Sequence, residues 1–129
     1  MAKELSDLIV YCQTKQVGIT GAKLSNDDMK YCNMASMSEK AMRKVLEQFG
    51  RQERLIEYHK KVLSRIYPSG SHILSGNFNP IPYWKAGVQI AALNIQTVGQ
   101  YSRINRTLFR ANGNCGYVPK ESLTKVRKI

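Results

Sequence analysis

The sequence is poor in cysteine and has no long apolar run, and both features limit the classes of protein to which it can belong. Its 129 residues include three cysteines at wide spacing, which form neither a disulfide framework nor a zinc-binding pattern. A reducing compartment is the default for such a chain. The apolar stretch Leu8–Val10 is too short for a signal peptide, and no segment reaches the roughly 18 apolar residues of a membrane span. The sequence therefore predicts a soluble, intracellular protein.

Acidic residues are also scarce. The chain has 9 Asp and Glu against 20 Lys and Arg, which gives a formal net charge of +11. This balance favours an anionic partner such as nucleic acid, phosphate or an acidic membrane, although a solvated basic surface would explain it equally well. No carboxylate lies between Glu57 and Glu121. That segment therefore excludes a glycosidase-type carboxylate pair and offers no carboxylate ligand to a hard cation.

What is present predicts one α/β domain covering residues 1–129. The chain is 43% hydrophobic, which is enough to bury a core. Composition and apolar spacing predict strands at Leu8–Tyr11, Val62–Tyr67, Val88–Ile95 and Cys115–Val118. They predict helices at Met37–Phe49, Asn79–Trp84 and Tyr101–Phe109. Alternating strands and helices are typical of a fold with a parallel sheet.

Two connecting regions complete this assignment. The polar, glycine-punctuated stretch Thr14–Asn33 is expected to be a long surface loop. The charged run Arg51–Lys61 is either a continuation of the helix before it or a solvated connection. At the start of the first helix, Ser36 and Glu39 have the spacing of a capping box, in which Ser36 would cap the helix.

Three residues stand out as possible phosphate-binding groups. Arg65 and Tyr67 are two apart on one predicted strand, so their side chains point to the same face near its carboxyl end, where parallel α/β folds bind ligands. Ser36 offers a hydroxyl at a predicted helix start, which is a common phosphate site. Each also has an ordinary structural explanation: a salt-bridged arginine, a packed tyrosine and a plain helix cap.

The remaining reactive side chains do not form a catalytic set. His59 and His72 have no Cys, Asp or second His at ligand or triad spacing, and we assign no catalysis to them. The three cysteines are expected to be buried or inert. Along the last predicted helix, Arg103, Arg106 and Arg110 share a face that is either solvated or directed to an anionic partner. By spacing alone, the sequence contains no complete catalytic constellation.

Several segments, in order, resemble the Y-box of eukaryotic phosphoinositide-specific phospholipase C. The resemblance covers roughly residues 3 to 123, nearly the whole chain. It is based on the segments Glu4–Cys12, Met34–Glu39, Leu63–Pro68, Asn79–Pro80 with Trp84, Gln89–Thr97 and Asn112–Val118. Departures from the usual family residues occur at Leu74, Val88, Ile95 and Pro119.

The resemblance implies an α/β fold that is the second half of a TIM-type barrel, with about four parallel strands alternating with helices. In this family an X half and a Y half assemble the barrel, and a whole barrel needs about 250 residues. The resemblance also implies that Ser36 and Arg65 hold ring phosphates of the inositol headgroup. Tyr67 would pack against the ring, and Thr14 falls near a further hydroxyl position.

Family chemistry uses two histidines and a Ca²⁺ ion, which the resemblance assigns to the X half. This chain is therefore expected to bind no cofactor and to be inactive by itself. Joined to an X half, it would contribute headgroup binding to the hydrolysis of phosphatidylinositol 4,5-bisphosphate to diacylglycerol and inositol trisphosphate in intracellular signalling. The expected partners are that lipid, an acidic membrane surface and the X half, with no nucleic acid. The expected location is cytoplasmic and peripheral at the inner membrane surface. The alternative is a catalytically inactive phosphoinositide-binding or scaffold module.

Overall fold

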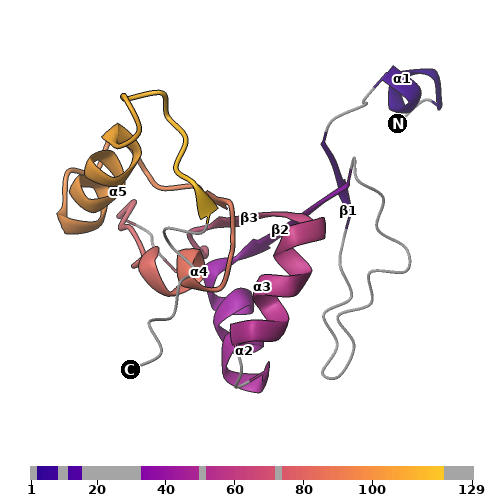
Figure 1. Ribbon diagram of the computed structural model, residues 1–129, viewed down its shortest axis with the longest axis horizontal. Coiled ribbons are helices and arrows are strands. Elements are labelled where there is room, and N and C mark those ends of the chain that lie inside the picture. The colour runs from indigo at the N-terminus through magenta and orange to yellow at the C-terminus, as the bar shows by residue number, and fades with distance from the viewer. Residues whose placement is uncertain (1–2, 9–11, 16–32, 50–51, 72–73, 121–129) are drawn as a thin grey trace.

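The computed structural model describes residues 3–8, 12–15, 33–49, 52–71 and 74–120 (Figure 1). Within these ranges a four-stranded sheet is combined with five helices. In chain order the elements are α1 (Lys3–Leu8), β1 (Gln13–Lys15), β2 (Asn33–Ser38), α2 (Glu39–Phe49), α3 (Gln52–Lys61), β3 (Leu63–Tyr67), α4 (Ile81–Lys85), β4 (Ile90–Ala91) and α5 (Gln100–Arg110).

The strands form one parallel sheet in the order β1-β2-β3-β4. Strands that follow one another in sequence are neighbours in the sheet, and helices lie in the connections between β2, β3 and β4. This is the arrangement of consecutive strand–helix units in a β/α barrel. The predicted parallel α/β sheet is therefore confirmed. Since parallel strands all end at the same edge, the residues that follow β3 and β4 are brought together there.

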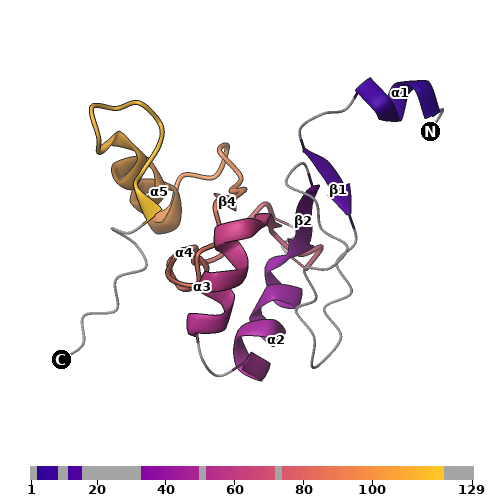
Figure 2. The ribbon, with the colours of Figure 1, turned by 45° about the vertical axis from the view of Figure 1, so that its right-hand side comes forward.

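Helices α2 and α3 cover one face of this sheet, and they lie side by side in both views (Figures 1 and 2). Ala35 of β2 and Ile66 of β3 point into that layer and are fully buried. Ile66 packs in a cluster with Met42 of α2 and Leu55 of α3, as the helical spacing of α2 predicts. Because side chains alternate along a strand, the residues between these point to the opposite face.

The segment around α4 follows the sequence prediction. Pro80 precedes the helix, and the chain turns at Gly87, which has a φ of +89°. A Cβ at Gly87 would lie 3.1 Å from the Cβ of His59. Only glycine meets both demands without strain, because it accepts a positive φ and brings no side chain into the contact. Trp84 at the end of α4 is buried and packs edge-on against Phe109 of α5.

The amino-terminal strand prediction is wrong where the structure tests it. Lys3–Leu8 is a helix, and residues 9–11 lie outside the described ranges. Leu5 and Leu8 are three residues apart, which is a helical spacing rather than the two-residue period of a strand. The first strand is Gln13–Lys15, at the start of the predicted loop Thr14–Asn33, whose residues 16–32 also lie outside the description.

The prediction that Ser36 caps the first long helix is also wrong. Ser36 lies inside β2, and the helix begins at Glu39. The cap is Ser38, whose Oγ accepts the amide hydrogen of Ala41 at 3.3 Å. Pairing with β1 and β3 on both sides holds Asn33–Ser38 extended despite its weak strand propensity. The run predicted as a continuation or a connection is a separate helix, α3.

The last two predicted strands are shorter or absent. In Val88–Ile95 only Ile90–Ala91 is a strand, because β4 pairs with β3 alone in the described sheet and the chain then turns away. Ile95 is 84% exposed rather than covered. Cys115–Val118 is irregular: positive φ values at Asn112, Gly113 and Asn114 turn the chain before it. Cys115 is consequently exposed, so of the two alternatives expected for the cysteines, buried or inert, burial does not hold for it.

Candidate functional site

Three of the predicted site residues come together on the sheet face opposite α2 and α3. Register pairs Ser36 of β2 with Arg65 of β3, and Ser38 with Tyr67. The Nη1 atom of Arg65 donates a hydrogen bond to Ser36 Oγ at 3.3 Å. The guanidinium carbon of Arg65 also lies 5.4 Å from the centroid of the Tyr67 ring, within the range of a cation–π contact. One arginine thus joins a hydroxyl on one side and an aromatic ring on the other.

The charge of Arg65 has no carboxylate beside it in the part of the chain that the structure describes. The ion pair found there joins Lys60 to Glu57, on α3. The ordinary explanation for Arg65, a salt-bridged surface residue, therefore has no support among the described side chains. An arginine that already lies against a hydroxyl and a ring, with its charge unneutralised, is suited to an anionic ligand.

The site remains open to such a ligand. Tyr67 is 37% exposed, and Ser36 and Arg65 are half-buried. A guanidinium has five N–H donors, of which one is used by Ser36. The Ser36 hydroxyl accepts that bond and keeps its own hydrogen for donation. The arrangement can therefore present several donors to phosphate oxygens and a flat ring beside them.

Thr14 lies on the same sheet face but does not join this cluster. It pairs with Met34 of β2, which precedes Ser36 by two residues and shares its face. The Thr14 side chain is exposed, and no contact in the described structure links it to Ser36, Arg65 or Tyr67. The structure places Thr14 toward the sheet edge formed by β1.

Glu39 and Tyr83 support the site, and sequence reasoning missed both. Glu39 follows β2 directly, and its buried carboxylate accepts the amide hydrogen of Ser69, two residues after Tyr67. The Tyr83 hydroxyl donates to the Glu39 carbonyl oxygen at 3.0 Å, and burial raises the pKa of that phenol. The ends of β2 and β3 are thereby tied together. The only signal in the sequence was an acid at the helix start, which we interpreted as half of a capping box.

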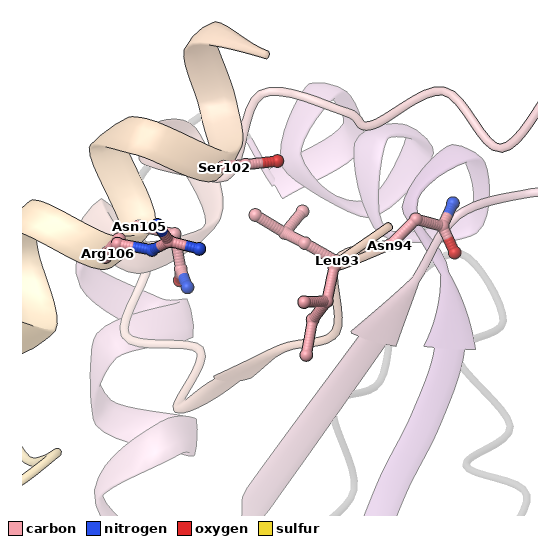
Figure 3. Close-up of a pocket in the computed structure, with 6 residues that line it drawn as sticks. Leu93, Asn94, Ser102, Asn105 and Arg106 are labelled. Carbon is pink, nitrogen blue, oxygen red and sulfur yellow. The ribbon is translucent and has the colours of Figure 1, made fainter. Parts of the chain in front are cut away.

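A polar network fixes the chain where it leaves β4. The Asn77 Oδ1 accepts the amide hydrogen of Asn94 at 2.7 Å, and Asn77 Nδ2 donates to Ser102 Oγ of α5 at 2.9 Å. The Asn94 side chain in turn donates to the Ser75 carbonyl at 3.1 Å. Beside this network lies a pocket of about 200 Å³ (Figure 3). It is lined by Leu93, Asn94, Ile95, Ser102, Asn105 and Arg106.

His59 is a buried residue that bonds the main chain of a neighbouring segment. It lies in α3 and is buried, and its Nδ1 bonds the Ala86 carbonyl oxygen at 2.8 Å, so Nδ1 carries the hydrogen. Burial lowers the pKa of His59 to about 4, although the bond to Ala86 opposes this shift. The imidazole is therefore neutral near neutral pH. His72 lies outside the described residues.

The described residues do not provide a calcium site. Among them, no three His, Cys, Asp or Glu side chains lie together closely enough to hold a metal ion. The carboxylate nearest to the site in sequence, Glu39, already accepts a backbone hydrogen bond. Among the described residues, no helix has the length and apolar composition that crossing a membrane requires.

Comparison with known proteins gives consistent matches over nearly the whole chain. The family profile described as phosphatidylinositol-specific phospholipase C, Y domain, matches residues 5–123. The 1-phosphatidylinositol 4,5-bisphosphate phosphodiesterase eta-1 of Mus musculus is 45% identical over 120 residues, covering 93% of this chain and 7% of that protein. Inactive phospholipase C-like protein 1 of Homo sapiens is 38% identical over 125 residues, covering 97% of this chain and 11% of that protein.

Solved structures give the same result for the fold. The crystal structure of L. pealei PLC21 matches with a TM-score of 0.81 at 35% sequence identity, over 97% of this chain and 16% of that one. The S. officinalis PLC21 structure matches equally well, with a TM-score of 0.81 at 34% identity. The four parallel strands with their helices are therefore half of a TIM-type barrel. The chain spans a small fraction of the length of the relatives it matches.

Proposed function

Because this chain belongs to the phosphatidylinositol-specific phospholipase C family, as its Y domain, we propose that it supplies the headgroup-binding side of a phosphoinositide phospholipase C. The observation that carries this proposal is the Arg65 guanidinium, which lies between the Ser36 hydroxyl and the Tyr67 ring without a carboxylate partner in the described structure. The reaction is hydrolysis of phosphatidylinositol 4,5-bisphosphate to diacylglycerol and inositol trisphosphate, as part of intracellular signalling.

In this mechanism the residues of the chain bind and orient the substrate. Arg65 pairs with a ring phosphate through the N–H groups that Ser36 does not use, and Ser36 donates its hydroxyl hydrogen to the same or an adjacent phosphate. Tyr67 packs its ring against the inositol ring and holds the guanidinium in place. Fixing the headgroup lowers the barrier by positioning the scissile phosphodiester, and proton transfer is left to another part of the enzyme.

The proposal assigns the remaining chemistry to an X half, in the same chain or in another. Family membership suggests calcium use, and the described residues contain no cluster of side chains that could hold the ion. The proposed partners of the Y domain are thus the phosphoinositide, the acidic membrane that contains it, and the X half. The proposed place of action is the cytoplasmic face of a membrane, where that lipid is available.

The test is hydrolysis by this chain co-expressed with the X domain of an active relative. Substituting Arg65→Ala should lower kcat/KM for phosphatidylinositol 4,5-bisphosphate by roughly 30- to 1,000-fold, or about 2–4 kcal/mol, since a charged phosphate contact is lost. Arg65→Lys should recover only part of this loss, because an ammonium lacks the planar fork of a guanidinium. Arg54→Ala, which removes an exposed arginine from α3, is the matched control.

A second candidate, a catalytically inactive phosphoinositide-binding or scaffold module, is favoured by the relative whose name describes it as inactive. The same experiment separates the two. Headgroup binding without turnover beside a competent X half would favour the scaffold. Turnover that is identical in wild type and Arg65→Ala would refute the role assigned to Arg65.

A further inference from the structure

Helix α5 has a basic face that the headgroup site does not use. Arg103, Arg106 and Arg110 are all exposed and recur at spacings of three and four, so they form one stripe along the helix. No carboxylate occurs in α5, or anywhere between Glu57 and Glu121. Within the described residues, none of the three arginines forms an ion pair. This stripe is therefore a concentration of positive charge with no neutralising partner in the described structure.

The orientation of α5 is fixed by contacts from its other sides. Phe109 packs edge-on against the buried Trp84, with ring centroids 5.9 Å apart. Ser102 is bonded to Asn77 and to the carbonyl oxygen of Thr97. These contacts hold the helix against the body of the domain, so the arginine stripe is presented outward in a defined direction.

Aliphatic side chains are exposed beside this stripe. Ile95 and Val98 lie in the connection between β4 and α5 and are 84% and 78% exposed. Single exposed apolar residues are ordinary, but Ile95 lines the same pocket as Arg106 (Figure 3), and Val98 follows it in the same connection. Exposed aliphatic groups next to cations are the combination found on surfaces that lie in the headgroup region of a bilayer.

This surface also lies at the edge of the sheet at which the headgroup site opens. Residues 93–98 follow the carboxyl end of β4, and Tyr67 is at the carboxyl end of its neighbour β3. Parallel strands end at a common edge, so the connection and the headgroup site open at the same edge. In contrast, α2 lies away from α5 in both ribbon views (Figures 1 and 2).

We propose that the connection at residues 93–99 and the arginine stripe of α5 form a second membrane-contacting surface that binds anionic phospholipid. The proposal rests on the proposed function, since it brings the headgroup site to the lipid surface. The arginines attract lipid phosphates and carboxylates, and Ile95 and Val98 insert at the boundary of the acyl chains. The exposed apolar groups of this connection are aliphatic, which suits hydrocarbon better than the stacking of nucleic-acid bases.

The test is sedimentation of the chain with vesicles of phosphatidylcholine, with and without phosphatidylserine. Binding should require phosphatidylserine. The triple variant R103Q/R106Q/R110Q should bind roughly 100-fold more weakly, because each cation near an anionic surface contributes about a factor of five. The matched control K40Q/K44Q/R54Q removes the same charge from exposed positions on α2 and α3, and it should change binding less than about threefold. The variant I95S/V98S keeps the charge and should weaken binding roughly tenfold.

Equal losses in the arginine variant and its control would overturn the proposal, because the effect would then belong to net charge. Salt-dependent binding to RNA that exceeds binding to the vesicles would also overturn it. Failure of the proposed function is separately visible: Arg65→Ala should weaken phosphatidylserine binding by no more than about fivefold, the effect of one cation, and the α5 variant should leave binding of soluble inositol trisphosphate unchanged. Circular dichroism of each variant verifies that it is folded.

Discussion

The two faces of the sheet are built from alternate residues of the same strands, yet they differ in nearly every property. On the covered face, Ala35 and Ile66 are fully buried against α2 and α3. On the open face, their chain neighbours Ser36 and Arg65 are half-buried and polar, and they are bonded to each other across the strands. The two-residue period of a strand places packed side chains on one face and polar, accessible side chains on the other.

This separation shows how a basic domain can keep a charged site without weakening its core. Burying an arginine on the covered face would cost several kcal/mol unless it were paired. On the open face the same side chain stays partly hydrated and rests on Tyr67. Substitutions on the two faces should therefore change different quantities.

The largest effect on stability is expected on the covered face. Ile66→Ala should lower the free energy of unfolding by about 2–5 kcal/mol, because Ile66 is fully buried and its removal leaves a cavity between β3 and the helices. Its neighbour Arg65→Ala should lower it by less than about 1 kcal/mol. Urea denaturation of both variants measures the contrast. Similar losses at the two positions would remove the distinction between the faces.

A slightly smaller effect is expected from pH, again on the helix-covered side. The pKa of buried His59 is about 4, against 6.5 for an ordinary histidine, so the unfolded state binds more protons between these values. The contribution of neutral His59 to the free energy of unfolding is fully present above pH 6.5. It is lost as the pH falls to 4, and the total loss is on the order of 3 kcal/mol.

The variant His59→Gln isolates this contribution, because carboxylates that titrate in the same range remain present in it. Urea unfolding measured at several pH values should show a shallower loss of stability in the variant than in the wild type. Parallel curves for the two proteins would mean that His59 is not held neutral by folding.

The smallest effect distinguishes two serines of β2. Ser38→Ala should lower the free energy of unfolding by about 1 kcal/mol, because the hydroxyl of Ser38 caps α2. Ser36→Ala removes only a bond to a partly hydrated guanidinium and should cost less than about 0.5 kcal/mol. Thermal unfolding of both variants is the measurement. A larger loss of stability in Ser36→Ala than in Ser38→Ala would indicate instead that Ser36 is the helix cap.

The sequence pattern predicted those helices and strands that are determined by residues close together in the chain. The run of branched and aromatic residues that ends at Tyr67 is β3. Helix α4 follows Pro80 and the chain turns at Gly87, as the proline and the glycine predict. Helix α5 differs from its prediction by one residue at each end. The strand β2 was missed because its polar sequence is held extended by two neighbours. No local signal carries that information.

The site was predicted in part for the same reason. Arg65 and Tyr67 share a face through strand geometry alone, which the sequence does indicate. Their meeting with Ser36 depends on the register of β2 against β3, across 29 residues of chain. The bond from the Ser69 amide to the Glu39 carboxylate depends on tertiary packing in the same way. Pattern pointed to Ser36 only as a hydroxyl at a predicted helix start, whereas the residue lies inside β2.

The most direct test of the open face as a headgroup site is the affinity of soluble inositol trisphosphate for the chain in complex with an X domain, measured by isothermal titration calorimetry. Arg65→Ala should weaken binding by at least about tenfold, as expected for the loss of a charge-assisted phosphate contact, and Arg54→Ala should leave it unchanged. Equal affinities for wild type and Arg65→Ala would contradict the account.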